Sequence, residues 1–425
     1  MMIHVQHWFF WLFLSLYLAF LAVEFTLDYL NLRHIEKNRG KIPELFAGTF
    51  SEEEYRRSIA YTRAKTHYSW VKSGFDALLL WTLILSGAFW SIDVWLGQWL
   101  PNHSLPHQVA YPFVVGALIY LVHLPFSVYY QFVLEERFGF NKMKSGTFVL
   151  DQVKGIALSL ALGIPLLTLI FWLVPTIGPN WWLAAWAVLM LFQLVTAALF
   201  PVVLAPIFYK FTPLQEGELK DRLERLTEKL RFKMAGVFTI DGSRRSAHSN
   251  AFFAGLGKTR RIVLFDTLIQ SLNPAEIVAV IAHEIGHNKR RHILKGLVLS
   301  SLTTLGSLYV LEKCLEWPPF FEAFGVPEPS LQIGFVIFGL LSSVFTFPLN
   351  PIFQWLSRRN EYEADRYSVE VNGDKEGMIS SLVKLSKDNL SNLTPHPWYS
   401  FYHYSHPTTT ERARAILAFA TSRNG

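Results

Sequence analysis

The sequence predicts an all-α integral membrane protein with seven transmembrane helices and a small α+β domain on the cytoplasmic side. Three observations support this fold class: seven long apolar segments, a low content of charge, and an alternation of basic and uncharged loops. Hydrophobic residues make up 51% of the 425 residues and charged residues only 17%, whereas soluble domains carry about 25% charge. This balance excludes a disordered chain and argues against a soluble enzyme.

Each apolar segment is long enough to cross the hydrocarbon core of a bilayer, which takes about 20 mostly apolar residues. Trp and Tyr cluster at several segment ends, as is typical of side chains at the membrane–water interface. The first segment lacks a basic start and a small-residue cleavage site, so it is interpreted as a retained span. The expected spans are 7–30, 70–98, 108–134, 147–175, 181–208, 293–317 and 331–357.

The basic residues predict how the chain is oriented in the membrane. Lys and Arg are absent from 73–136, 155–209 and 314–357, and these stretches contain the second, fourth and sixth loops. The positive-inside rule therefore places the other loops and the C-terminus in the cytoplasm, and the N-terminus on the outer or lumenal side. The net charge of +6 is spread over all inner loops, which excludes a nucleic-acid partner. The expected location is the endoplasmic reticulum membrane in a eukaryote or the inner membrane in a bacterium.

The chain divides into alternating membrane and polar parts. Residues 1–208 hold spans one to five and a cytoplasmic loop at 32–67, and residues 293–357 hold spans six and seven. The polar segments 209–292 and 358–425 flank the last two spans. Because the two ends of a helical hairpin lie side by side, these polar segments are expected to fold together on one face of the membrane.

The first polar segment carries recognisable local patterns. Residues 214–231 have Leu at helical spacing and predict an amphipathic helix. The runs AGVFTID, AFFAGLG and RIVLFD predict three short strands. Next, Asn273, Pro274 and Glu276 form the pattern of a capped helix start. The helix that begins there is expected to run past His287.

This predicted helix carries the sequence His283-Glu284-Ile285-Gly286-His287, which is an H-E-x-x-H motif. Residues at i and i+4 share one helix face, so both imidazoles can reach one Zn²⁺ ion. Glu284 would lie beside the metal and take a proton from water, whose pKa zinc lowers toward ~7. The alternative, two ordinary histidines, is disfavoured by the capped apolar helix around the motif.

A catalytic zinc needs a third protein ligand. Glu361 and Asp365 lie at i and i+4 on a predicted helix after span seven. There Glu361 can ligate zinc and Asp365 can orient a ligand histidine, whereas Glu363 points to another face. The hairpin of spans six and seven brings this helix toward His283 and His287. Alone, the acidic run would be interpreted as an ordinary charged helix start at a membrane boundary.

A third cluster lies near the C-terminus, in the run HYSHPTTTERARAI. Hydrolysis of a peptide bond develops an oxyanion, which cationic or N–H donors stabilise. His406 and Arg412 are candidate donors. The equally weighted alternative is a helix start, with Thr408 or Thr409 as the cap and Glu411 in the first turn.

Taken together, these motifs resemble the type I CAAX prenyl endopeptidase family, which are integral-membrane zinc metalloproteases. The resemblance is carried by HEIGHNKRRH, SRRNEYEADRY, HYSHPTTTERARA, LEERFGFNK and SNAFFAGLGKTRRIVLFDTL, so it covers nearly the whole chain. It implies Glu361 as the third ligand and Glu284 as the base. It also implies that His406 and Arg412 are polar groups near the substrate.

The family resemblance has further implications for the fold and the substrate. It implies that the seven helices form a barrel around an intramembrane chamber, with the zinc site facing that chamber. It also implies that an extended substrate pairs with the strand that begins Asn250-Ala251-Phe252. Strand addition of this kind holds a peptide through its backbone, with little preference for its side chains.

The sequence therefore predicts a membrane-embedded zinc endopeptidase with one Zn²⁺ per chain and with the lipid bilayer as its surroundings. By resemblance, its substrates are prenylated CAAX proteins or peptides. One alternative keeps the chemistry but makes the protein a membrane quality-control protease without a lipid requirement. A remote alternative is a seven-span transporter or receptor, although no paired half-repeats support it. The sequence favours no particular oligomeric state.

Ionisable residues within the expected spans form a last group. Charges at membrane depth are costly and usually face protein or water. Glu24, Asp28 and Asp76 are interpreted as groups near span ends that snorkel or pair. Asp151 and Lys154 are expected to pair with each other at i and i+3.

Overall fold

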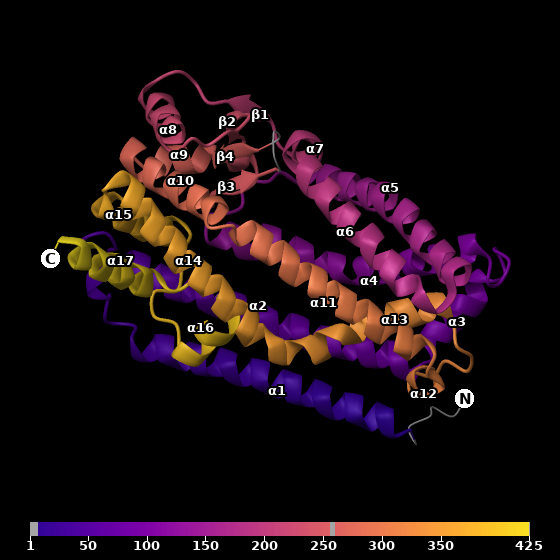
Figure 1. Cartoon of the computed structure of the whole chain (residues 1–425). Helices are drawn as coiled ribbons and strands as arrows, with labels where there is room; N and C mark the ends of the chain where they lie inside the picture. Colours follow the sequence, from indigo (N-terminus) through magenta and orange to yellow (C-terminus); the bar gives the residue numbers. More distant parts are fainter. Residues whose placement is uncertain (1–6, 256–259, 425) are drawn as a thin grey trace.

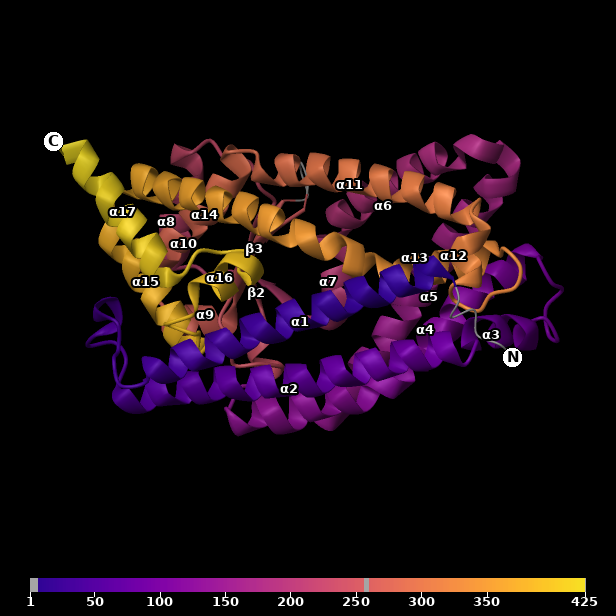
Figure 2. The same cartoon turned by 90° about the horizontal axis from the view of Figure 1, so that it is seen from below.

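The computed structural model describes residues 7–255 and 260–424. This part of the chain is 77% helical and contains one small sheet. Figure 1 shows an elongated body of long helices, with the sheet at one end and the start of α1 (Trp8–Lys37) and α12 (Pro318–Glu322) at the other. Figure 2, the view from below, shows α1 and α2 along one side and α11, α13 and α14 along the other.

Within the described residues, five helical stretches are long and apolar enough to cross a membrane, and a bent pair of helices makes a sixth candidate. The bent pair is α2 (Glu52–Leu85) and α3 (Ala88–Leu96), which meet at 64°. Gly87 allows this bend, because its φ of 67° lies in the left-handed region. The five stretches are α1 (Trp8–Lys37), Leu105–Glu135 with α4 (Leu105–Tyr129), Ser145–Phe208 with α5 (Ser145–Ile177), α6 (Trp181–Leu199) and α7 (Ala205–Phe208), α11 (His292–Leu315), and Leu331–Asn372 with α13 (Leu331–Thr346) and α14 (Asn350–Asn372).

The apolar side chains of these helices face outward. Only 6% of the most apolar window is buried in both Ser145–Phe208 and α11. Leu191 and Leu302 are 63% and 61% exposed. A continuous apolar surface of this extent is not tolerated in water, so lipid must cover it. The protein is therefore an integral membrane protein.

The first connection is more helical than the sequence predicts. The expected loop at 32–67 is reduced to the stretch between α1, which ends at Lys37, and α2, which begins at Glu52. Ser51 and Glu54 form a capping box: the Ser51 hydroxyl accepts from the Glu54 backbone N–H, and the Glu54 carboxylate accepts from the Ser51 N–H. This local signal lies well before the apolar part of the helix, which is why the apolar pattern alone missed the helix start.

The sheet has four strands in the order β1-β2-β4-β3. β2 and β4 are parallel, whereas β1 pairs antiparallel with β2 and β3 pairs antiparallel with β4. The three strands that the sequence predicts are confirmed, and β3 lies at an edge of the sheet. The strands are β1 (Phe211–Pro213), β2 (Gly236–Ile240), β3 (Ala251–Ala254) and β4 (Arg261–Phe265).

Shorter helices complete the chain, and some of them lie beside the sheet. The predicted amphipathic helix is confirmed as α8 (Glu218–Lys229), whose Leu223 and Leu226 pack in one apolar core with β4 and α10. The others are α9 (Asp266–Ser271), α10 (Pro274–Lys289), α12 (Pro318–Glu322), α15 (Lys375–Asp388), α16 (Pro397–His403) and α17 (Thr409–Asn424).

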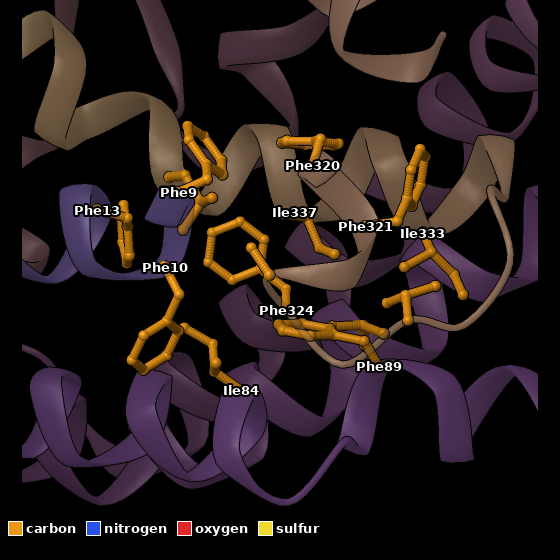
Figure 3. Packing of buried hydrophobic residues seen from close by; sticks show 14 of the residues in the cluster. Phe9, Phe10, Phe13, Ile84, Phe89, Phe320, Phe321, Phe324, Ile333 and Ile337 are labelled. Atoms are coloured by element: carbon orange, nitrogen blue, oxygen red, sulfur yellow. The ribbon is translucent and has the colours of Figure 1, made fainter. Parts of the chain in front are cut away.

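The opposite end of the molecule is filled by aromatic side chains. Figure 3 shows rings from the start of α1 packing against rings from α12 and the turn after it, with Ile333 and Ile337 of α13 among them. Phe13 and Phe324 have no exposed surface, and their rings meet edge to face with centroids 5.5 Å apart. The labelled members of this cluster, the aromatic cluster from here on, are Phe9, Phe10, Phe13, Ile84, Phe89, Phe320, Phe321, Phe324, Ile333 and Ile337.

The predicted pairing of Asp151 with Lys154 is wrong. Asp151 instead accepts two hydrogen bonds from Arg245, at 2.8 and 3.0 Å, and Lys154 donates to the carbonyl of Ile207. The planar guanidinium matches a carboxylate in two places at once, which a lysine one turn away does not. Other intramembrane groups do pair as expected: Asp76, for example, contacts both Lys72 and His123.

Candidate metal centre

The helix α10 presents the H-E-x-x-H motif, and its start is fixed by polar contacts. Asn273 accepts from the backbone N–H of Glu276, and the Glu276 carboxylate accepts from the N–H of Asn273. Lys384 on α15 lies 2.7 Å from the same carboxylate. The predicted capped start and the predicted run past His287 are thus confirmed, since α10 ends at Lys289.

A glycine lets α10 approach α14 closely. A Cβ atom built on Gly286 would lie 3.2 Å from the Cα of Ala364 and 3.1 Å from the ring of Tyr367. A side chain at position 286 would require Ala364 or Tyr367 to shift by a few tenths of an ångström, so glycine eases the close approach of the two helices. The close approach brings the acidic residues of α14 to the histidines of α10.

Three ligand-type side chains converge across this contact. Nε2 of His283 and Nε2 of His287 are 3.1 Å apart, and Glu361 lies 3.5 Å from the first and 3.3 Å from the second. One ligand atom from each of the three lies within 4.8 Å of the other two. The group therefore has the size and the donor types of a metal site.

The donor atoms of this group also fit a cation chemically. Oε2 of Glu361 is buried and has no hydrogen-bond partner among the described residues. A buried oxygen of this kind is costly unless an ion or a donor satisfies it. Two imidazole nitrogens and a carboxylate are ligands that zinc takes in catalytic sites, with a fourth position left open.

A buried carboxylate supports His283. Oδ1 of Asp365 lies 2.8 Å from Nδ1 of His283, and Arg412 donates to both Asp365 oxygens at 2.6 and 2.8 Å. Nη1 of Arg412 also lies 3.4 Å from Oε2 of Glu361. Asp365 thus occupies the position that the sequence predicts, and Arg412 both lines the cavity and holds Asp365.

Burial and charge set the protonation of two groups on α10. Burial opposes charge on His283, but the nearby carboxylates of Asp365 and Glu361 outweigh it and raise the pKa of the imidazole to about 9. A cation bound at Nε2 would take the place of that proton. Burial also raises the pKa of the Glu284 carboxyl, which makes it a better proton acceptor when it is ionised.

The support of His287 is a contact that the sequence did not predict. Nδ1 of His292 lies 3.0 Å from Nδ1 of His287, and Nε2 of His292 lies 3.1 Å from Glu363. Glu363 does point away from the metal group, as the sequence predicts, but it reaches that group through His292. The available signal was the third histidine of HEIGHNKRRH, which lies five residues after the second.

A cavity of about 900 Å³ adjoins the metal group. Phe252, the third residue of the predicted substrate strand, does not line it; its ring lies near those of Phe200 and Phe265. The predicted site residues that do line the cavity are Asn250, Ala251, His283, Glu284, His406 and Arg412.

His406 lies just before α17 and faces the metal group. Its Nε2 is 3.4 Å from Oε1 of Glu361, and 63% of its side chain is exposed. Thr408 caps the helix by accepting from the backbone N–H of Glu411. The two alternatives for this cluster are therefore compatible, because the same turn starts the helix and carries a histidine into the cavity.

A membrane-spanning helical body with an H-E-x-x-H helix and a carboxylate from a second helix has the architecture of a membrane metallopeptidase. Residues 31–210 match the family model described as "CAAX prenyl protease N-terminal, five membrane helices". Residues 213–420 match "Peptidase family M48".

Relatives of known name align along nearly the whole chain. A CAAX prenyl protease 1 homolog of Arabidopsis thaliana is 35% identical, with 95% of this chain and 97% of that protein aligned. CAAX prenyl protease 1 of Saccharomyces cerevisiae is 33% identical, with 94% of each chain aligned. The crystal structure of S. mikatae Ste24p superposes with a TM-score of 0.86 at 32% identity and covers 95% of this chain and 98% of its own.

The chain belongs to the CAAX prenyl protease 1 family, within the M48 peptidases. This membership confirms the resemblance that the sequence motifs predict, and it excludes the transporter or receptor alternative. The family implies a bound metal, and the group formed by His283, His287 and Glu361 could hold it.

Proposed function

We propose that the protein is a zinc endopeptidase that removes the C-terminal residues of prenylated CAAX proteins or peptides. The observation that carries the proposal is the convergence of His283, His287 and Glu361 beside Glu284, at the wall of a large cavity. The names of the relatives support the substrate class.

In this proposal, one Zn²⁺ per chain is held by His283, His287 and Glu361. When bound, the ion supplies Lewis acidity, which polarises a carbonyl and acidifies water. Glu284 takes a proton from the attacking water and returns it to the leaving amine. His406, which faces the same cavity, donates to the oxyanion that develops on the scissile carbonyl, with Arg412 adding positive charge.

The substrate is proposed to bind as an added strand. β3 pairs with β4 on one side only, so its other edge is free within the sheet, and Asn250 and Ala251 at its start line the cavity. An extended peptide can complete the backbone hydrogen bonds of such an edge. Phe252 then contributes backbone hydrogen bonds only, since its side chain lies near the rings of Phe200 and Phe265.

We further propose seven membrane crossings around the cavity, with the metal group on the cytoplasmic side. Ser145–Phe208 is too long for one crossing, and it turns at Gly178–Asn180 so that α5 and α6 count separately. The alternation of basic loops supports the cytoplasmic orientation. In a eukaryotic host this would place the protein in the endoplasmic reticulum membrane, and in a bacterium in the inner membrane.

Two variants test the metal and base assignments. Glu284→Gln should retain zinc at the parental ratio but lose turnover of a farnesylated CAAX peptide. His283→Ala should lose zinc in metal analysis of the purified protein. Cleavage by Glu284→Gln at the parental rate would remove that residue as the base, and an unchanged zinc ratio in His283→Ala would remove it from the ligand set.

The quality-control alternative shares this chemistry and differs in the substrate. The large cavity would also admit unprenylated chains, and the edge of β3 would bind them through backbone hydrogen bonds. Comparing cleavage of one peptide with and without its farnesyl group separates the two functions. We expect a strong preference for the farnesylated peptide; equal rates would favour quality control.

A further inference from the structure

One wall of the cavity carries a lysine that no carboxylate neutralises by direct contact. Lys65 on α2 lines the cavity and belongs to the exposed residues of the chain. No ion pair within the described residues includes it. Its Nζ lies 4.9 Å from the centre of the Tyr61 ring, one turn earlier on the same helix. A cation in this position can receive an anionic group from a ligand.

The acidic residue nearest in its electrostatic effect on Lys65 is Glu135, and both of its carboxylate oxygens already contact other side chains. Glu135 attracts Lys65 electrostatically, but one of its oxygens accepts from the Tyr61 hydroxyl at 2.6 Å, and the other lies 3.2 Å from Nε2 of His248. Glu135 is only 5% exposed. It ends the π-helical segment Tyr130–Glu135, in the LEERFGFNK motif that the proposed mechanism does not use.

The same contacts tie Lys65 to the substrate strand. The ring of His248 stacks on Phe140 with centroids 3.9 Å apart, and its Nδ1 lies 2.9 Å from Asn389. Asn389 also accepts from the backbone N–H of Ser249. His248 precedes β3 by three residues, so the wall that carries Lys65 adjoins the N-terminal end of that strand.

We propose that Lys65 binds the free α-carboxylate at the C-terminus of the substrate, an inference that rests on the proposed function. A carboxylate held there makes the peptide run antiparallel to β3, with its C-terminus near His248 and the scissile bond toward His283. Lys65 thus fixes how many residues separate the cut from the chain end.

The test compares two farnesylated peptides that differ only in a C-terminal acid or amide. The parent should cleave the acid about 10- to 100-fold more efficiently, through a lower KM, as expected for a charge-assisted hydrogen bond. Lys65→Met should abolish most of this preference, and Lys65→Arg should restore part of it. Lys41→Met makes the same charge change in the loop between α1 and α2 and should keep the parental preference.

Peptide binding to the Glu284→Gln variant, which is expected not to cleave, gives a second readout that needs no turnover. Anisotropy of labelled acid and amide peptides should show the same discrimination, and the added Lys65→Met change should remove it. Equal affinity for both peptides, or a preference that survives Lys65→Met, overturns the carboxylate assignment. A parent that binds and discriminates but fails to cleave the farnesylated acid contradicts the proposed function instead.

Discussion

The two histidines of the candidate metal centre are held in different ways. His283 is 7% exposed, and it contacts Asp365, which is 1% exposed and paired with Arg412. His287 is 21% exposed, and its support passes through His292 to Glu363, which is 31% exposed. One histidine therefore rests on a buried ion pair, and the other on a chain of contacts that reaches the surface.

These two kinds of support indicate where the site is vulnerable. Removing one partner of a buried ion pair leaves a charge in the interior without compensation, which is strongly destabilising. At the protein surface, water and dissolved ions replace a lost contact, so ion pairs there contribute little to stability. Changes on the His283 side should accordingly affect folding and metal together, whereas those on the His287 side should affect metal alone.

Asp365→Ala should have the largest effect. It removes the contact to His283 and leaves Arg412 buried without its main partner. We expect zinc affinity to fall about 100-fold and the free energy of unfolding to fall by about 3–5 kcal/mol. Chelator competition and thermal unfolding measure the two effects. Asp365→Asn, which keeps an acceptor, should lose less, and parental zinc retention in the alanine variant would contradict the assigned support.

Gly286→Ala should disturb both sides at once, because it pushes α10 away from α14. Overpacking of this kind costs about 1–3 kcal/mol, and zinc affinity should fall with stability. Gly296→Ala is the matched control, since nothing lies within 4 Å of its added Cβ; it should be neutral or gain up to about 1 kcal/mol. Equal melting temperatures for the two variants would show that α10 and α14 are not tightly packed.

His292→Ala should lower zinc affinity about 10-fold with little change in melting temperature. His292→Asn should restore part of the affinity, because its amide oxygen can still accept from Nδ1 of His287. Chelator competition on both variants tests the contact. If the asparagine variant behaves like the alanine variant while both fold, the histidine acts by packing and not by orienting its neighbour.

Glu363→Gln should have the smallest effect, a few-fold in zinc affinity, which corresponds to ~1 kcal/mol or less for a partly exposed pair. The effect should shrink in high salt. Combining it with His292→Ala should add almost nothing, because both act through one chain of contacts. Additive losses in the double variant would separate Glu363 from His292.

The sequence predicted the elements whose signals are local. Apolar segments of membrane length, the capped start of α10 at Asn273 and the H-E-x-x-H spacing each depend on residues close together in the chain. The hairpin argument also placed Glu361 beside the motif, because it needed only the order of the spans. These features were therefore accessible before any tertiary contact was known.

The parts that the sequence missed depend on contacts between distant residues. Asp151 has a lysine one turn away, but its partner is Arg245, 94 residues later. His292 and Glu363 are 71 residues apart. The early start of α2 was missed for a different reason, because its first turns are polar and only Ser51 and Glu54 mark it.

The position of the aromatic cluster bears on the route by which cleaved peptide fragments leave the protein. Its side chains pack together between α1, α3, α12 and α13 at the end opposite the metal group. We therefore expect no passage for cleaved fragments between these helices. On this expectation, the fragments leave at the end of the molecule that holds the metal group or between other helices.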